Sequence, residues 1–267
     1  MSSPNKTGIE RVTTLPKRAG ATTDDFLGGR ISVIQPRSGH RSGSDAVWLQ
    51  AAVPARPRDR VLDVGAGVGV AGLALLARVP KLELTATEID AGLCALATEN
   101  AARNGFADNV TIVEADVTLP AKTLQAKGLA REGYDHVMTN PPFYAEGSAR
   151  AGPAKAAAHI MAAGALPAWI GFLTAATAAK GSLTIIHRPE VLGELLPLLH
   201  GRFGALTVFP LFPKESEPAT RIILQGRKGS RAGIKLLPGL VLHRDDGRYT
   251  AKAEAVLRQG ETLDLGG

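Results

Sequence analysis

Short apolar stretches rich in β-branched residues alternate with longer helix-forming stretches from Arg60 onward, and this alternation constrains the fold more than any other feature. It is typical of a mostly parallel sheet that is covered by helices on both faces. The expected strands span 60–64, 82–87, 110–114, 134–139, 182–187, 205–209 and 220–225, and the expected helices span 70–79, 91–104, 167–179 and 190–200.

The last two expected strands have only a loop between them. No crossover helix fits there, so residues 205–209 and 220–225 should pair antiparallel at one edge of the sheet. The predicted fold class is therefore α/β, with a mostly parallel sheet, helices on both faces and an antiparallel edge strand.

Net charge bears on the kind of partner. The 31 Lys and Arg residues exceed the 25 Asp and Glu residues, which gives a net charge of +6. A basic balance favours an anionic partner, nucleic acid above all, although a solvated surface with a few extra basic side chains gives the same balance. Cys94 is the single cysteine, so no intrachain disulfide can form, which fits a reducing cytoplasm.

Neither a metal site nor a membrane segment is expected. The six histidines include no pair at ligand spacing, and there is no cysteine cluster. Residues 160–179 are uncharged and long enough to span a bilayer, but they are mostly Ala, Gly and Thr and contain Pro167. A buried helix that begins near Pro167 is the better interpretation.

A glycine-rich loop, residues 63–69 (DVGAGVG), follows the first expected strand. Glycines allow a tight turn and the close approach of a ligand to the start of the next helix. Gly67, Gly69 and Gly72 also match the dinucleotide pattern G-x-G-x-x-G, and Glu88 at the end of the next strand is placed to accept ribose hydroxyls. The loop alone fits NAD, S-adenosylmethionine or a purely structural turn.

Asp63 favours S-adenosylmethionine. It precedes Gly65, where the ammonium group of a methionine would attract a carboxylate and the pyrophosphate of NAD would be repelled. Ile89 could pack on the adenine, or it is an ordinary core residue. Asp116, after the third expected strand, is placed to accept from the adenine amino group, or it caps a helix or loop. The cofactor-binding candidates are therefore Asp63, Gly65, Gly67, Gly69, Glu88, Ile89 and Asp116.

The fourth expected strand ends in Asn140-Pro141-Pro142-Phe143-Tyr144. An amino group on an aromatic ring or an amide is a poor nucleophile because its lone pair is delocalised. The Asn140 side-chain oxygen and the Pro141 carbonyl could each accept one N–H and aim the lone pair at the methyl donor. Phe143 offers a face on which a planar target can stack. The alternative is a proline turn with an Asn cap and a core aromatic residue.

These motifs resemble those of amino-methylating class I methyltransferases, and most of all the bacterial tRNA adenine-N6 methyltransferases that act beside the anticodon of a valine tRNA. Further similar stretches are 35–36 with 43–49, 187–190, 211–214 with 219–221, and 228–229. The resemblance implies a Rossmann-like, seven-stranded sheet whose seventh strand is antiparallel. It implies S-adenosylmethionine as cofactor, Ser44 and Asp45 near its methionine end, Asn140, Pro141 and Phe143 as catalytic residues, and an RNA partner.

Alternative functions stay open. Enzymes that methylate guanine in ribosomal RNA, adenine in DNA or the glutamine of release factors share the motif around Asn140. A nicotinamide dehydrogenase would need a proton relay, and the sequence shows no Tyr-x-x-x-Lys or His–Asp arrangement. A catalytically silent RNA-binding module is a further alternative, against which intact Asp63, Glu88 and Asn140 argue.

Two basic stretches are candidates for phosphate binding. Arg30, Arg37, His40 and Arg41 precede Asp45 without an acidic residue among them, and residues 221–235 contain five basic residues and no acidic one. Both could bind phosphates, or form a solvated face. The substrate-binding candidates are Arg41, Pro142, Phe143, Tyr144, Arg221 and Lys228.

The length of 267 residues suits one large domain. We expect a mobile polar tail over residues 1–24 and a single methyltransferase domain over 25–263. Within it, 25–58 would form an N-terminal cap, 59–228 the Rossmann-like core, and 229–263 an extension packed on the core, with a short helix near 251–259.

Overall fold

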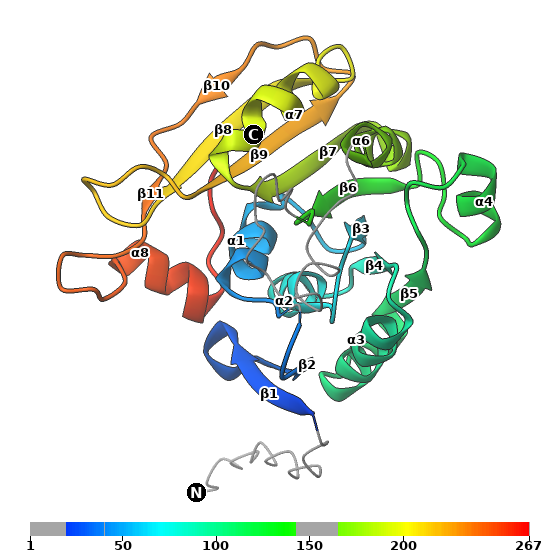
Figure 1. The fold of residues 1–267 in the computed structure, drawn as a ribbon, viewed down its shortest axis with the longest axis horizontal. Coiled ribbons are helices and arrows are strands. Elements are labelled where there is room, and N and C mark those ends of the chain that lie inside the picture. Colours follow the sequence, from blue (N-terminus) through cyan, green and yellow to red (C-terminus); the bar gives the residue numbers. More distant parts are fainter. Residues whose placement is uncertain (1–19, 40, 143–164, 267) are drawn as a thin grey trace, which may run out of the picture.

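A computed structural model describes residues 20–39, 41–142 and 165–266 (Figure 1). Its first elements form a separate antiparallel hairpin of β1 (Ala21–Phe26) and β2 (Ile31–Pro36), joined by the short helix η1 (Leu27–Gly29). Because β1 begins at Ala21, residues 21–24 belong to this paired hairpin and the tail predicted over 1–24 is too long.

A central sheet of nine strands follows, in the order β10-β8-β9-β7-β6-β3-β4-β5, with β11 paired to β8. The strands are β3 (Arg60–Val64), β4 (Glu83–Glu88), β5 (Val110–Glu114), β6 (Tyr134–Thr139), β7 (Thr177–His187), β8 (Phe203–Phe212), β9 (Arg221–Lys228), β10 (Lys235–Leu236) and β11 (Leu240–Val241). Pairing is parallel except for β9, which is antiparallel to both β7 and β8.

The prediction of a mostly parallel α/β sheet with an antiparallel seventh strand is confirmed: β9 is the seventh of the long strands that begin with β3. Its predicted place at the edge is wrong. The connection from β7 to β8 contains η3 (Pro189–Val191) and α7 (Leu192–Leu199), so β8 can run parallel to β7 with a gap between them. Strand β9 returns into that gap, and β10 and β11 extend the sheet beyond β8.

Helices cover both faces of the sheet because consecutive strand residues point to opposite sides. Val61 belongs to one core, with α1 (Ser44–Ala52), α2 (Val70–Arg78) and the C-terminal segment. Leu62 belongs to the other, with α4 (Ala121–Ala126), α6 (Ala165–Ala176) and α7. The remaining helical segments are α3 (Ala91–Arg103), η2 (Ala107–Asn109), α8 (Ala251–Glu254) and η4 (Ala255–Gln259).

The C-terminal segment packs against α1. The Leu263 N–H donates to the Ala51 carbonyl (2.8 Å), and Leu263 and Leu265 are buried in the first core. Within the described part of the stretch 160–179, helix α6 covers only residues 165–176, and none of the described helices combines the length and apolarity needed to cross a membrane.

Candidate active site

The carboxyl ends of four parallel strands meet at one edge of the sheet. Val64 of β3 lies opposite both Thr87 of β4 and Thr139 of β6, and Glu88 lies opposite Glu114 of β5. Strand order reverses between β3 and β6, and in open α/β sheets ligands bind outside the carboxyl ends of the strands at such a point. The predicted cofactor loop and the Asn140 motif therefore begin side by side.

The glycine loop is a tight turn held by β4. The N–H groups of Gly65 and Ala66 both donate to the Thr87 carbonyl, at 2.9 and 3.0 Å. Gly65, Gly67 and Gly69 have φ values of 71°, 58° and 89°, in the left-handed region that favours glycine. Gly69 caps α2, so the loop leads directly into the start of that helix.

Asp63 lies at the base of this loop. It is only 2% exposed, and its Oδ2 accepts a hydrogen bond from the Gly72 N–H (3.2 Å) in the first turn of α2. Burial, together with the nearby Glu88 carboxylate, raises the pKa of Asp63 to about 7. A cationic ligand group beside Asp63 would favour its charged form.

Glu88 joins the glycine loop to the turn after β4. Its Oε2 accepts from the Gly67 N–H (2.9 Å), and its Oε1 accepts from the N–H groups of Ile89 (2.8 Å) and Asp90 (3.1 Å). The side chain of Ile89 is 64% exposed, so it is not the core residue that was one interpretation of the sequence. An exposed apolar side chain beside a carboxylate suits a nucleoside, with its base on Ile89 and its sugar hydroxyls at Glu88.

Asp116 follows β5 at the same edge. Its Oδ1 accepts from the backbone N–H and the hydroxyl of Thr118, at 2.9 and 2.6 Å. The capping interpretation is thus observed. It uses one carboxylate oxygen, which leaves Oδ2 for the amino group of a base.

Asn140 and the two prolines follow β6. The Thr139 hydroxyl donates to the Val64 carbonyl (2.8 Å), which ties the end of β6 to the end of β3. Asn140 and Pro142 are half-buried and Pro141 is buried. No described residue forms a hydrogen bond with the Asn140 side chain, so its amide is available to a ligand. Phe143 and Tyr144 lie outside the described residues.

Two predicted ligand-binding residues pair with each other at the same edge. Asp45, in the first turn of α1, accepts from the Arg221 Nε at 2.7 Å, and both side chains are about a quarter exposed. Ser44 precedes Asp45 and is exposed. This ion pair fixes α1 relative to the beginning of β9. The partly exposed guanidinium of Arg221 and carboxylate of Asp45 therefore lie beside Ser44.

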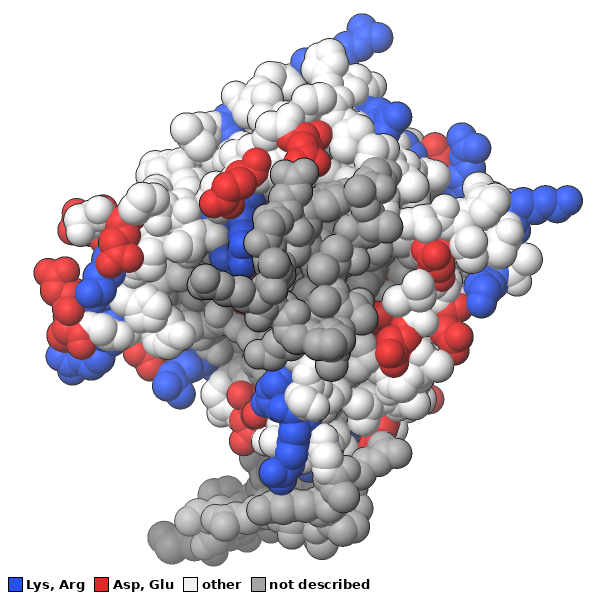
Figure 2. Space-filling model, viewed as in Figure 1, with Lys and Arg blue, Asp and Glu red and all other residues white. Residues whose placement is uncertain are grey.

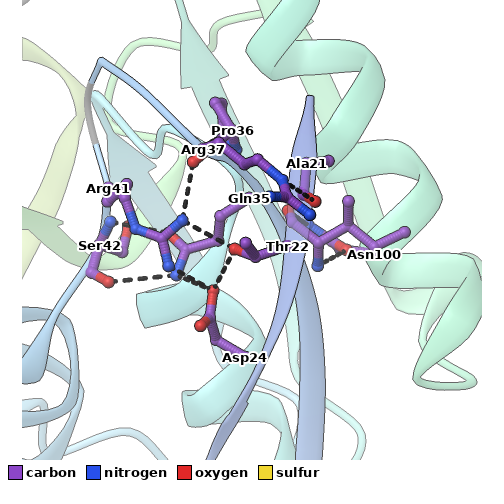
Figure 3. Close-up of polar contacts among 10 residues, drawn as sticks. Ala21, Thr22, Asp24, Gln35, Pro36, Arg37, Arg41, Ser42 and Asn100 are labelled. Atoms are coloured by element: carbon purple, nitrogen blue, oxygen red, sulfur yellow. Dashed lines mark hydrogen bonds and ion pairs between the residues drawn. The ribbon is translucent and has the colours of Figure 1, made fainter. Parts of the chain in front are cut away.

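The first basic stretch points back onto the chain (Figure 3). Arg41 donates to the Asp24 carboxylate (2.7 Å), the Thr22 hydroxyl (2.7 Å) and the Pro36 carbonyl (2.8 Å). Arg37 donates to the Ala21 carbonyl, and Arg30 to the carbonyls of Ala77 and Gln259; His40 lies outside the described residues. Figure 2 shows basic and acidic side chains interspersed on the face in view. The described arginines of this stretch brace the hairpin, and the side chain of Arg41 remains 34% exposed.

Lys228 is far from Asn140. Antiparallel pairing puts Lys228 beside Phe203, the first residue of β8, at the amino edge of the parallel strands. Its ammonium group donates to the carbonyls of Thr174 (2.8 Å) and Thr177 (2.6 Å) and to Glu132 (3.1 Å). The structure therefore does not bring Lys228 together with the other predicted substrate-binding residues.

Two residues at the carboxyl edge were not predicted as site residues. His187 ends β7, where Ile185 pairs with Thr139 of β6, and burial lowers the pKa of His187 to about 4. Trp169 of α6 lies over the glycine loop: its ring would be 3.2 Å from a Cβ added at Gly65. A polar residue that ends an apolar strand is a sequence signal for His187, whereas the contact of Trp169 depends on tertiary packing.

Together these features fit a nucleoside-containing cofactor. Along a single edge of the sheet lie, in order, the left-handed glycine loop, the Glu88 carboxylate with the exposed Ile89, and Asp116. The buried carboxyl group of Asp63, which suits an ammonium group, lies at one end of this series. The described residues contain no group of three His, Cys, Asp or Glu side chains that could hold a metal ion.

Comparisons with known proteins agree with this geometry. Residues 42–168 match the family model of the methyltransferase small domain. The chain is 28% identical over 243 residues to the tRNA1(Val) (adenine(37)-N6)-methyltransferase of Dickeya chrysanthemi. The alignment covers 88% of this chain and 93% of the relative. The enzyme of the same name from Aeromonas hydrophila is 27% identical, with 84% and 92% covered.

Solved structures show the same fold. A predicted O-methyltransferase from Agrobacterium tumefaciens is 28% identical and superimposes with a TM-score of 0.70, over 82% of this chain and 98% of that chain. An S-adenosylmethionine-dependent O-methyltransferase from Thermotoga maritima has a TM-score of 0.51 at 18% identity, over 73% and 68% of the two chains. The family model, the two relatives and the Agrobacterium structure are all described as methyltransferases, and the Thermotoga structure shows the shared fold.

Proposed function

Because this chain is similar in sequence and fold to S-adenosylmethionine-dependent methyltransferases, we propose that it is such an enzyme and that its methyl acceptor is the exocyclic amino group (N6) of an adenine in tRNA. Two relatives that align over most of their length carry the name of such an enzyme. The observation that carries the proposal is the placement of Asn140. This residue follows the end of β6, next to Gly65 at the end of the paired strand β3, and its side-chain amide forms no hydrogen bond with a described residue.

Bound S-adenosylmethionine supplies an electrophilic methyl group on a positively charged sulfur. Asn140 Oδ1 and the Pro141 carbonyl each accept one N–H of the target, which fixes the nitrogen with its lone pair toward that methyl group. Both acceptors also stabilise the positive charge that develops on the nitrogen. Pro141 and Pro142 restrict the backbone that carries these oxygens. No base has to act before the attack, since the amino proton can leave after the methyl group has transferred.

The other roles belong to the same proposal. Asp63 and the pair of Ser44 and Asp45 hold the methionine end of the cofactor, Gly65, Gly67 and Gly69 allow its close approach, and Glu88, Ile89 and Asp116 hold the adenosine. Phe143 provides the stacking face, with Pro142, Tyr144, Arg41 and Arg221 around the target. Such an enzyme would work in the cytoplasm, where tRNA is found.

Nitrogen is a better acceptor than oxygen at this site, although a similar structure is described as a predicted O-methyltransferase. A sugar hydroxyl needs a base to remove its proton. The nearest titratable side chain on the neighbouring strand is His187, and a pKa of about 4 makes it a weak base at neutral pH. Two carbonyl-type acceptors match the two N–H groups of an amino nitrogen.

The test uses S-adenosylmethionine labelled on the methyl group and a valine tRNA transcribed in vitro, followed by digestion and separation of the nucleosides. We expect label in N6-methyladenosine, and none when the adenine at tRNA position 37 is replaced by guanine. Label in a 2′-O-methyl nucleoside, or only in protein added to the reaction, would refute the proposal.

A further inference from the structure

Asn100 is a fully buried polar residue of α3 that lies beside the N-terminal hairpin (Figure 3) and contacts two separate parts of the chain. Its Oδ1 accepts from the Ile34 N–H of β2 at 2.7 Å, and its Nδ2 donates to the Ile34 carbonyl at 3.0 Å. The same Nδ2 donates to the carbonyl of Val68 in the glycine loop at 3.1 Å. One side chain therefore links the N-terminal hairpin to the predicted cofactor loop.

Asn104, four residues after Asn100 and directly after the last residue of α3, provides a natural comparison. Its Oδ1 accepts from the Ser32 N–H (2.9 Å) and its Nδ2 donates to the Ser32 carbonyl (2.9 Å), so it grips β2 as Asn100 does. Its remaining bond goes to the carbonyl of Asn100 within α3 (2.8 Å). Both residues hold the hairpin, but only Asn100 also holds the loop.

Besides Asn100, the side chains of Glu88 and Thr139 form hydrogen bonds with the backbone of this loop. Its first half is fixed by β4, through the Thr87 carbonyl and the Glu88 carboxylate. Its second half turns through the left-handed Gly67 and Gly69 on either side of Val68, whose side chain is buried in the core, and the Gly69 N–H donates to the Ala66 carbonyl at 2.9 Å. Asn100 fixes the peptide between Val68 and Gly69 in this half, next to the start of α2.

We infer that Asn100 is a positioning residue for cofactor binding: by holding the Val68 carbonyl it keeps the glycine loop in its ligand-ready shape. A loop that is already ordered loses less entropy when a ligand binds, so affinity rises without a direct contact. Asparagine suits this position because its amide offers both the acceptor for Ile34 and the donors for Ile34 and Val68. The inference rests on the cofactor and is independent of the identity of the methyl acceptor.

The test measures the binding of S-adenosylhomocysteine by titration calorimetry to Asn100→Ala and Asn100→Ser, with Asn104→Ala as the matched control. We expect the Asn100 variants to raise the Kd about tenfold, and Asn104→Ala to change it less than twofold despite a lower melting temperature. Serine is included because it preserves a polar group at the position while being too short to span both Ile34 and Val68.

Two further measurements separate positioning from a general loss of stability. Hydrogen exchange of the amides of residues 65–70 should speed up in the Asn100 variants and stay unchanged in Asn104→Ala. In a transfer assay, the KM for the cofactor should rise while kcat at saturating cofactor changes less than about threefold. A folded Asn100 variant with unchanged Kd, or an equal rise in Kd for Asn104→Ala, would overturn the inference.

Discussion

The two edges of the central sheet use their polar residues in opposite ways. At the amino edge, the polar groups are paired with one another. At the carboxyl edge, the Asn140 amide has no partner among the described residues, Ile89 is exposed, and Asp63 is buried against a single backbone N–H. The polar groups of the amino edge thus contribute stability, whereas the carboxyl edge combines structural contacts of Glu88 and Asp116 with groups such as Asn140 that remain available for a ligand.

Three interactions fasten the amino edge. His136 bridges the Ser182 hydroxyl (2.8 Å) and the Asp59 carboxylate (3.0 Å), and burial lowers the pKa of His136, so the neutral ring can accept from the serine while it donates to the aspartate. Arg60 pairs with Asp135, and Lys228 holds the end of α6. Each of these groups joins neighbouring strands or a strand and a helix.

The largest effect on turnover is expected from a substitution of Asn140 at the carboxyl edge. Asn140→Ala removes one of the two acceptors proposed for the target nitrogen, and turnover should fall by roughly 10²-fold or more. Because the residue is half-buried and free of structural hydrogen bonds within the described residues, the melting temperature and the Kd for S-adenosylhomocysteine should change little. A labelled-methyl transfer assay at saturating cofactor measures the first effect, and calorimetry measures the second.

Asn140→Asp sharpens this prediction. The carboxylate retains an acceptor oxygen, so the variant should keep more turnover than Asn140→Ala. Equal turnover in the wild type and Asn140→Ala would remove Asn140 from the catalytic role.

A smaller, pH-dependent effect is expected from Asp63. If its charged form binds the ammonium group of the cofactor, affinity for S-adenosylhomocysteine should rise about five- to tenfold between pH 6 and pH 8, as a carboxyl group with a pKa of about 7 ionises. Calorimetry across this range tests the prediction. In Asp63→Asn the dependence should disappear, and a wild-type affinity that does not vary with pH would contradict the proposed contact.

Asp63 should also make the free protein less stable as the pH rises. The pKa in the folded state lies above its ordinary value of 3.8, so the folded chain holds this proton more tightly than the unfolded chain does. Its stabilising contribution is therefore complete below about pH 4 and is lost as the pH approaches 7. Thermal melts of the wild type and Asp63→Asn should show the difference changing within this interval.

The sequence predicts the strands and the loops at their ends because both depend on local patterns. It predicts α/β alternation, the glycine loop and the motif at Asn140, and the structure places the described parts of these motifs at one edge. It does not predict the partners of long side chains. Arg221 and Lys228 belong to one basic stretch, yet antiparallel β9 puts them at opposite edges. Strand order depends on the crossover through α7, and the contacts of Asn100 join segments distant in sequence.

Substitutions at the two ends of β9, Lys228 at the amino edge and Arg221 at the carboxyl edge, test the contrast between the two edges within one strand. Lys228→Met should lower the free energy of unfolding by about 1–3 kcal/mol, because the carbonyls of Thr174 and Thr177 lose a charged donor. Transfer kinetics and RNA affinity at a temperature where the variant is folded should be unchanged. Arg221→Met, at the other end of β9, should instead weaken RNA or cofactor binding. Weaker RNA binding in Lys228→Met, with a smaller salt dependence, would restore Lys228 as a phosphate contact.

The smallest effect is expected from the ion pair between Arg60 and Asp135 at the amino edge. The two side chains are 46% and 39% exposed, and solvent screening limits such a pair to about 0–1 kcal/mol. Arg60→Met removes the guanidinium, but the Arg60 backbone N–H still donates to Asp135 at 2.9 Å, so the junction of β3 and β6 should persist. Urea denaturation should show a small loss of stability, and transfer kinetics should match the wild type. If the loss exceeds that of Lys228→Met, exposed charge pairs rather than buried carbonyl contacts hold the amino edge together.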